Sequence, residues 1–203
     1  MLSIFYENLK SKMVTIENPR PFICDGNPLA CNIFIVGFNA ATEMQTKFED
    51  FWSNKNGFNK SEWLNIYISE RQAKPLPTGK TRRNTVSSTR QRIEWLTEYL
   101  YPVSCLETNL FSKATVDAKS LDKSDQTTAV FDFLLDTVKP KLIITHGIDA
   151  KRYFESKYNR AISDNEILQL NENLALVSVS HLSRGWSKEK TQGLAMKIKN
   201  HMC

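Results

Sequence analysis

The 203-residue chain lacks the features that mark several specialised protein classes. It has no apolar run near the ~18 residues that a membrane helix requires. Its first residues, MLSIFYENLKSKMV, lack the charged-then-apolar order of a signal peptide. None of its four cysteines forms a C-x-x-C pair; they are Cys24, Cys31, Cys105 and Cys203. We therefore expect a cytoplasmic protein with free thiols and no membrane partner.

Patterns for several kinds of catalysis are also missing. We find no Ser-His-Asp triad, no metal-ligand cluster and no phosphate-binding P-loop, so peptide or phosphate-ester hydrolysis is poorly supported. The charge balance is only mildly uneven, with a net charge of +5 and a pI of about 9.0. Such an excess permits an anionic partner such as nucleic acid without requiring one.

Short apolar strands alternate with amphipathic helices along the chain. We expect strands at 31–37, 103–111, 141–147 and 174–180, and helices at 3–14, 43–53, 88–101, 127–137, 148–158 and 187–202. The stretch WLNIYISE, 63–70, fits a strand or a helix. The alternation predicts a single α/β domain, 1–203, with a mostly parallel four-stranded sheet covered on both faces.

Polar side chains stand where the expected strands end. Asn39 follows the apolar run IFIVG, Asn109 lies near the end of the second strand, and His146 ends the third. His181 and Ser183 follow the fourth. Because the carboxyl ends of parallel strands share one edge, these groups can converge there. Each also has a structural explanation, since Asn suits turns and a single His, His146 above all, is often only structural.

This set of side chains favours one kind of reaction. An asparagine cannot take a proton at neutral pH, but it can orient a water molecule. A second asparagine can read the edge of a nucleobase through two hydrogen bonds. A neutral histidine can donate a hydrogen bond to charge that develops on a leaving group. Together they suit hydrolysis with an anionic leaving group and a cationic sugar centre.

The motifs GFNAAT, ETNLF and HLSRGW, in this order on alternating strands and helices, resemble the uracil-DNA glycosylase superfamily. The resemblance runs from about residue 20 to the end, and STRQRIEWL is similar to the helix between the family's first two core strands. It implies a three-layer α/β/α sandwich that hydrolyses the N-glycosidic bond of uracil or another deaminated or damaged base in DNA. We expect a monomer that acts on DNA without a cofactor or a metal.

The resemblance assigns roles to individual residues, in the manner of the mismatch-specific and single-strand-selective branches. Asn39 would position the water, Asn109 would read the base edge, and His181 would stabilise the departing base. Gly37 and Ser183 match further motif positions, and Phe38 would offer its backbone N–H to the base. Ala40-Ala41 replace the usual Pro-Gly, and Leu182 and Arg184 replace two prolines, which predicts a looser last loop.

Two further roles have alternatives. Phe48 or Phe51 would stack on the base, although both are equally well explained as core residues. Arg184 or Trp186 would fill the gap that a flipped base leaves, and packing under the last helix explains Trp186 at least as well. Some branches bind an iron–sulfur cluster through four cysteines, but the spacing here does not match, so we expect none.

A basic segment at 71–92 contains seven Lys and Arg residues and no acid. As a DNA-contact arm it would bind phosphates through Arg82, Arg83 and Arg90; the alternative is a solvated loop or insertion. Two other functions stay open. One is an altered glycosylase-fold protein that binds nucleic acid or a modified nucleotide without cleavage. The other is a small-molecule hydrolase or nucleotide-binding domain.

Overall fold

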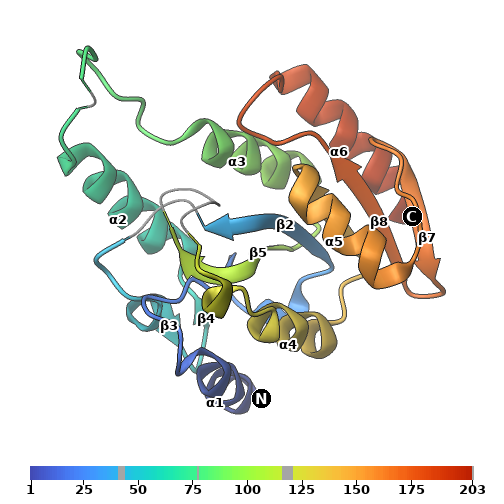
Figure 1. Ribbon diagram of the computed structural model, residues 1–203, viewed down its shortest axis with the longest axis horizontal. Coiled ribbons are helices and arrows are strands. Elements are labelled where there is room, and N and C mark those ends of the chain that lie inside the picture. Colours follow the sequence, from blue (N-terminus) through green and yellow to red (C-terminus); the bar gives the residue numbers. More distant parts are fainter. Residues whose placement is uncertain (41–43, 77, 116–120, 203) are drawn as a thin grey trace.

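A six-stranded sheet forms the centre of the computed structural model, which describes residues 1–40, 44–76, 78–115 and 121–202 (Figure 1). Its order is β1-β5-β2-β6-β8-β7, with β5, β2, β6 and β8 parallel and the two edge strands antiparallel. The bounds are β1 (Ile23–Cys24), β2 (Ile33–Ala40), β5 (Cys105–Ala114), β6 (Leu142–His146), β7 (Ile167–Asn171) and β8 (Leu174–Val179). The four expected strands are the parallel ones, and the prediction of a four-stranded sheet missed both edges.

Six helices accompany the sheet within the described ranges: α1 (Leu2–Met13), α2 (Lys60–Ala73), α3 (Ser88–Leu100), α4 (Ala129–Val138), α5 (Ile148–Tyr158) and α6 (Lys188–Met202). The five expected at 3–14, 88–101, 127–137, 148–158 and 187–202 are confirmed. The undecided stretch WLNIYISE belongs to α2. None of these helices has the length and apolar character needed to cross a membrane.

The helix expected at 43–53 was wrong for the part of it that is described. A single 3-10 turn, Phe48–Phe51, leads instead into a small hairpin of β3 (Trp52–Ser53) and β4 (Gly57–Phe58). The aromatic spacing that imitates a helical face comes from a cluster of rings. Phe48 lies 5.0 Å from Phe22, and Phe51 lies 5.9 Å from Phe58, between ring centroids.

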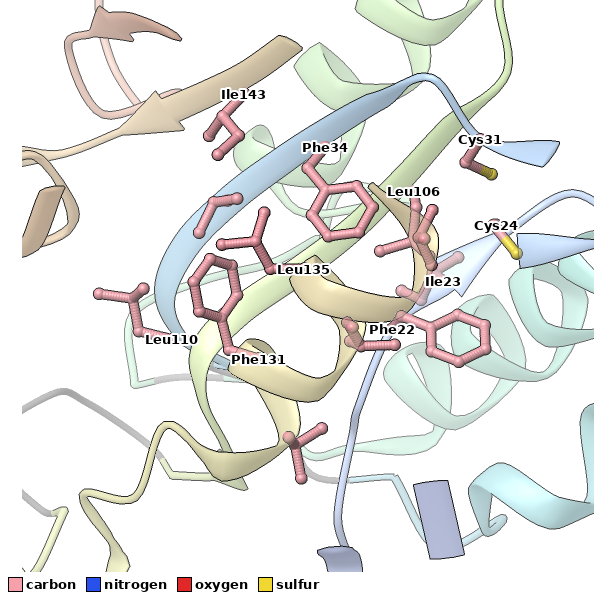
Figure 2. Packing of buried hydrophobic residues seen from close by; sticks show 14 of the residues in the cluster. Phe22, Ile23, Cys24, Cys31, Phe34, Leu106, Leu110, Phe131, Leu135 and Ile143 are labelled. Carbon is pink, nitrogen blue, oxygen red and sulfur yellow. The ribbon is translucent and has the colours of Figure 1, made fainter. Parts of the chain in front are cut away.

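Helices cover both faces of the sheet. Side chains of β2 alternate between the faces, as the pleat requires. Ile33 and Ile35 pack with α3 and α6, whereas Phe34 and Val36 pack with α4 and α5. Figure 2 shows Phe34 in the second of these layers, together with side chains of α4. Burial on both sides explains why the central strands are uninterrupted apolar runs.

The start of α3 is fixed next to α2. The Ser87 hydroxyl accepts a hydrogen bond from the Arg90 backbone N–H at 3.2 Å and so caps the N-terminus of α3. The Ser87 backbone N–H in turn donates to the Tyr67 hydroxyl, also at 3.2 Å. These bonds place the first turn of α3 against the second half of α2, above the ends of the parallel strands (Figure 1).

The three cysteines within the described ranges are free thiols. Cys24 and Cys31 are buried. Burial raises the pKa of the Cys24 thiol, and it raises that of Cys105 to about 12. Cys24 and Cys105 are therefore protonated at neutral pH and poor nucleophiles. Cys203 lies outside the described residues.

Candidate active site

A cavity of about 320 Å³ opens at the carboxyl ends of the parallel strands. It is lined by Asn39 of β2, Asn109 of β5, His146 of β6 and His181, which follows β8. The chain order of these residues spans more than 140 positions, yet the sheet topology brings them to one place. The structure thus collects these polar residues in one hollow, although Asn109 lies in the middle of β5 and not near its end as predicted.

Asn39 is held by the far end of β5. Its carboxamide nitrogen donates to the Thr115 hydroxyl at 2.6 Å. The Thr115 backbone N–H donates to the Ala40 carbonyl at 2.9 Å. The pairing of β2 with β5 becomes irregular between Asn39 and Ala40, and such bulges re-aim side chains beside functional sites. Ala41, the next residue of the predicted motif, lies outside the described residues.

Gly37 permits the close approach of two polar side chains. It pairs with Asn109 across the parallel ladder. A Cβ atom at Gly37 would lie 2.5 Å from Asn109 Oδ1 and 3.1 Å from His146 Nε2. Any larger residue would therefore displace the Asn109 carboxamide. The need for a glycine at position 37 therefore follows from the packing itself, without reference to the motif of the resembled family.

The proton of neutral His181 is placed by Ser183. His181 Nδ1 accepts the Ser183 backbone N–H at 3.2 Å and lies 2.8 Å from the Ser183 hydroxyl. An Nδ1 that accepts a backbone N–H leaves the ring proton on Nε2. Partial burial lowers the pKa of His181, and the nearby Arg184 lowers it further. The ring is therefore a neutral donor at physiological pH.

His146 is a second neutral imidazole beside the first. It is 7% exposed, and the His146 and His181 ring centroids are 5.1 Å apart in an edge-on arrangement. No described residue forms a hydrogen bond with its buried Nδ1. Burial, followed by repulsion from His181 and Arg90, lowers the pKa of His146 to about 3. His146 therefore lines the cavity wall beside His181.

The depressed pKa of His146 predicts acid sensitivity. Below pH 6.5 an unfolded chain protonates this histidine and the folded chain does not, so the free energy of unfolding falls as pH falls toward about 3. Between pH 7 and pH 5 this residue alone should remove about 2 kcal/mol. Urea denaturation of wild type and His146→Leu at both pH values measures the difference. Equal losses in the two proteins would contradict the prediction.

The loop after β8 is held without the two prolines. Leu182 is completely buried between α3 and α6, and Trp186 is 4% exposed in the same cluster. The Trp186 indole N–H donates to the Ser180 carbonyl at 3.3 Å. These contacts correct the expectation of a looser loop, and they leave Trp186 buried as a packing residue rather than available as a wedge. Arg184 is exposed.

Phe48 and Phe51 do not line the strand-end cavity. Both line a neighbouring cavity of about 160 Å³. Phe22 and Trp63 line both hollows, and Tyr67 is a third aromatic side chain in the one with Asn39. Phe48 and Phe51 are therefore better described as core residues than as residues that stack on a base in the strand-end cavity. The Phe38 ring, between Gly37 and Asn39 in sequence, packs edge-on against Phe111 at 5.0 Å.

The three arginines predicted to contact DNA lie in different environments. Arg82 is exposed. The Arg83 guanidinium donates to the backbone carbonyls of Arg71, at 2.6 Å, and of Lys74 and Pro75, so it ties the basic segment to the end of α2. Arg90 is 8% exposed, which corrects the expectation of a phosphate-contact residue on an exposed arm.

Arg90 belongs to a group of four charges, in which Arg90 and Glu107 are buried and Lys60 and Glu94 are half-buried. Its Nη1 lies 2.6 Å from Glu107 Oε2 and 2.9 Å from Glu94 Oε1. Lys60 Nζ lies 3.0 Å from Glu94 and 3.4 Å from Glu107. Burial would lower the pKa of Arg90, but the two carboxylates outweigh it and raise that pKa. We refer to Lys60, Arg90, Glu94 and Glu107 as the ion-pair cluster.

Several cavity residues escaped the sequence analysis. They include Arg20, Trp63, Tyr67, Arg71 and Glu107. Glu107 carried a usable signal, because it precedes Asn109 by two positions and so lies on the same face of β5. The others come from α2 and from the segment before β1, where no strand end marks them.

The chain matches no protein-family model and no curated protein sequence. Function must therefore be argued from the cavity itself. Among the side chains that the structure describes, no three His, Cys, Asp or Glu residues are grouped as a metal ion would require. The chemistry available in the described part of the cavity is that of amides, imidazoles, a carboxylate, hydroxyls and guanidinium groups.

Proposed function

We propose that this protein is a DNA N-glycosylase that releases uracil or another deaminated or damaged base. The observation that carries the proposal is the single cavity that holds Asn39, Asn109 and His181 at the ends of parallel strands. The arrangement fits a three-layer α/β/α fold of the uracil-DNA glycosylase type. The protein would act on DNA as a monomer, without a cofactor.

In the proposed reaction each group has one task. The Asn109 carboxamide hydrogen-bonds the edge of a base that has been flipped out of the helix. The Asn39 carboxamide, fixed through Thr115, orients the water that attacks the sugar carbon as the glycosidic bond breaks. The His181 Nε2–H donates to the oxygen on which negative charge develops. The bonding electrons leave with the base, and water supplies the oxygen and a proton.

Phosphate contacts would come from exposed basic residues, of which Arg82 in the basic segment and Arg184 in the loop after β8 are two. Contacts of this kind supply affinity without reading sequence, and they weaken steeply as salt rises. They suit a polymer of phosphates better than a single small substrate.

A base-release assay tests the proposal. Labelled oligonucleotides carry one uracil, hypoxanthine or mismatched thymine, single-stranded or opposite guanine, and alkali then cuts any abasic site. We expect wild type to release at least one of these bases and Asn39→Ala to be about 10²-fold slower, as for loss of a positioning group. Asn200→Ala, an exposed asparagine of α6, is the matched control.

The result separates the candidate functions. Release by wild type and Asn200→Ala but not by Asn39→Ala supports the glycosylase. Binding of the same oligonucleotides without any release would overturn it in favour of a protein that binds nucleic acid on this fold.

A further inference from the structure

Three residues on neighbouring strands form a row across the sheet. Gly37 of β2 pairs with Asn109 of β5. On the other side of β2, the parallel pairing with β6 joins Val36 to Thr145, so the next residue, His146, stands level with Gly37. All three members of the row lie on the face of the sheet that packs against α3 and α6, as the alternation along each strand requires. The row therefore has a glycine between two polar side chains.

Because Gly37 has no side chain, Asn109 and His146 reach the same small volume. A Cβ atom at Gly37 would lie 2.5 Å from Asn109 Oδ1 and 3.1 Å from His146 Nε2. The carboxamide that is proposed to hold the base and the Nε2 atom of His146 therefore border one space. Both residues line the strand-end cavity. A base that is held by Asn109 thus lies within reach of His146 Nε2.

His181 stands on the other side of His146. Strand β8 follows β6 in the sheet order, so the loop after β8 brings His181 next to His146, with the ring centroids 5.1 Å apart. Gly147 permits this approach, because its φ is +89° and a Cβ atom there would lie 3.1 Å from His181 Cδ2. The polar groups therefore follow the order of their strands, with His146 between Asn109 and His181.

The surroundings of His146 favour a ring proton on Nε2. His146 Nδ1 is buried, and no described residue forms a hydrogen bond with it. A buried N–H that lacks an acceptor is rarer in proteins than a buried acceptor that lacks a donor, so the proton belongs on the other nitrogen. Burial also lowers the pKa of His146 to about 3, so the ring is neutral at physiological pH. Like His181, His146 therefore offers an uncharged Nε2–H donor.

We propose that His146 is a second catalytic donor, whose Nε2–H binds the same base oxygen as His181. This inference rests on the proposed function for the reaction. A carbonyl oxygen has two lone pairs and can accept both hydrogen bonds. As the glycosidic bond breaks, its electron pair leaves with the base. The two imidazoles stabilise the charge that reaches the oxygen, and neither gives up its proton. Asn109 holds the adjacent edge of the base.

Two amide substitutions test the donor. The side-chain nitrogen of glutamine can take the place of Nε2, whereas that of asparagine reaches only as far as Nδ1. We therefore expect His146→Asn to slow single-turnover base release about 10²-fold, and His146→Gln to stay within about tenfold of wild type. His201→Asn changes an exposed histidine of α6 and should keep the wild-type rate. Equal slowing in both His146 variants, or a wild-type rate in His146→Asn, would overturn the inference.

A second measurement does not need turnover. Nitrogen-15 NMR of the imidazole rings at pH 7 shows which nitrogen carries the proton, and we expect Nε2–H in both His146 and His181. Both Nε2 signals should move when an oligonucleotide is added whose target nucleotide carries a 2′-fluorine, which resists glycosidic cleavage. Its base is the one that wild type releases, or uracil if none is released. The His201 signals should not move.

The NMR outcomes separate this inference from the proposed function. A proton on His146 Nδ1, or a His146 signal that does not move, overturns the second donor even if base release persists. Movement of both Nε2 signals without release of any base would keep the pair of donors as a binding site and reject the glycosylase.

Discussion

Replacing His181 by alanine is expected to slow base release about 10²–10³-fold, the usual effect of removing one donor to a developing anion. The Ser183 backbone N–H occupies His181 Nδ1 at 3.2 Å, so the single ring proton of the neutral histidine lies on Nε2. Alanine removes that donor and leaves the other cavity groups in place. The effect is measured as the single-turnover rate on a labelled oligonucleotide. This oligonucleotide carries the base that the wild-type protein releases.

The chain offers a matched control for this substitution. His201 lies in the last turn of α6 and is exposed. His201→Ala should leave the rate unchanged. A His181→Ala protein that retains the wild-type rate within threefold would contradict the proposed function of the imidazole. Affinity for the oligonucleotide should change little, because the hydrogen bond strengthens only as charge develops.

Glu107→Gln is expected to lower the free energy of unfolding by about 3–5 kcal/mol, the cost of removing one partner from a buried ion pair. The Glu107 side chain is 7% exposed, and it balances the charges of both Arg90 and Lys60. Glutamine has nearly the same shape as glutamate but no charge. Arg90 and Lys60 would then have Glu94 as their one carboxylate partner within the ion-pair cluster. Chemical denaturation at pH 7 measures the loss.

Two control variants are needed to interpret the effect of Glu107→Gln. Glu172→Gln changes an exposed carboxylate between β7 and β8 and should shift the unfolding free energy by less than about 0.5 kcal/mol. The double variant Glu107→Leu/Arg90→Met removes both charges and should recover part of the loss, because no unpaired arginine remains. A loss below 1 kcal/mol in Glu107→Gln would show that solvent reaches the ion-pair cluster.

Local patterns predicted the parallel part of the fold well. Apolar runs identify β2, β6 and β8, alternation identifies β5, and the helices between them have clear apolar faces. The edge strands were missed for a physical reason. β1 has two residues and exists only through its pairing with β5, about 80 positions away, and β7 is a five-residue edge strand with no buried residue.

The cavity was predictable only in part. Strand-end rules find Asn39, Asn109 and His181, because sheet topology alone brings them together. Charge pairing between distant segments is invisible along the chain, so Arg90 was grouped with the basic segment although its partner Glu107 lies 17 positions away. Only its i,i+4 partner Glu94 could have been found from the sequence. The 3-10 turn at Phe48–Phe51 was missed for a similar reason, because contacts with rings from distant segments stabilise it.

Stability and the proposed contact with the base depend on the same face of β5. Glu107, which anchors the ion-pair cluster, and Asn109, which faces the proposed base, are two positions apart and project to the same side. A one-residue slip of this strand would turn both side chains to the opposite face. Selection that keeps Glu107 in its ion pairs therefore also keeps the register of β5, on which the proposed contact between Asn109 and the base depends. Drift in specificity would be freer at exposed positions of the basic segment such as Arg82, where no such double constraint applies.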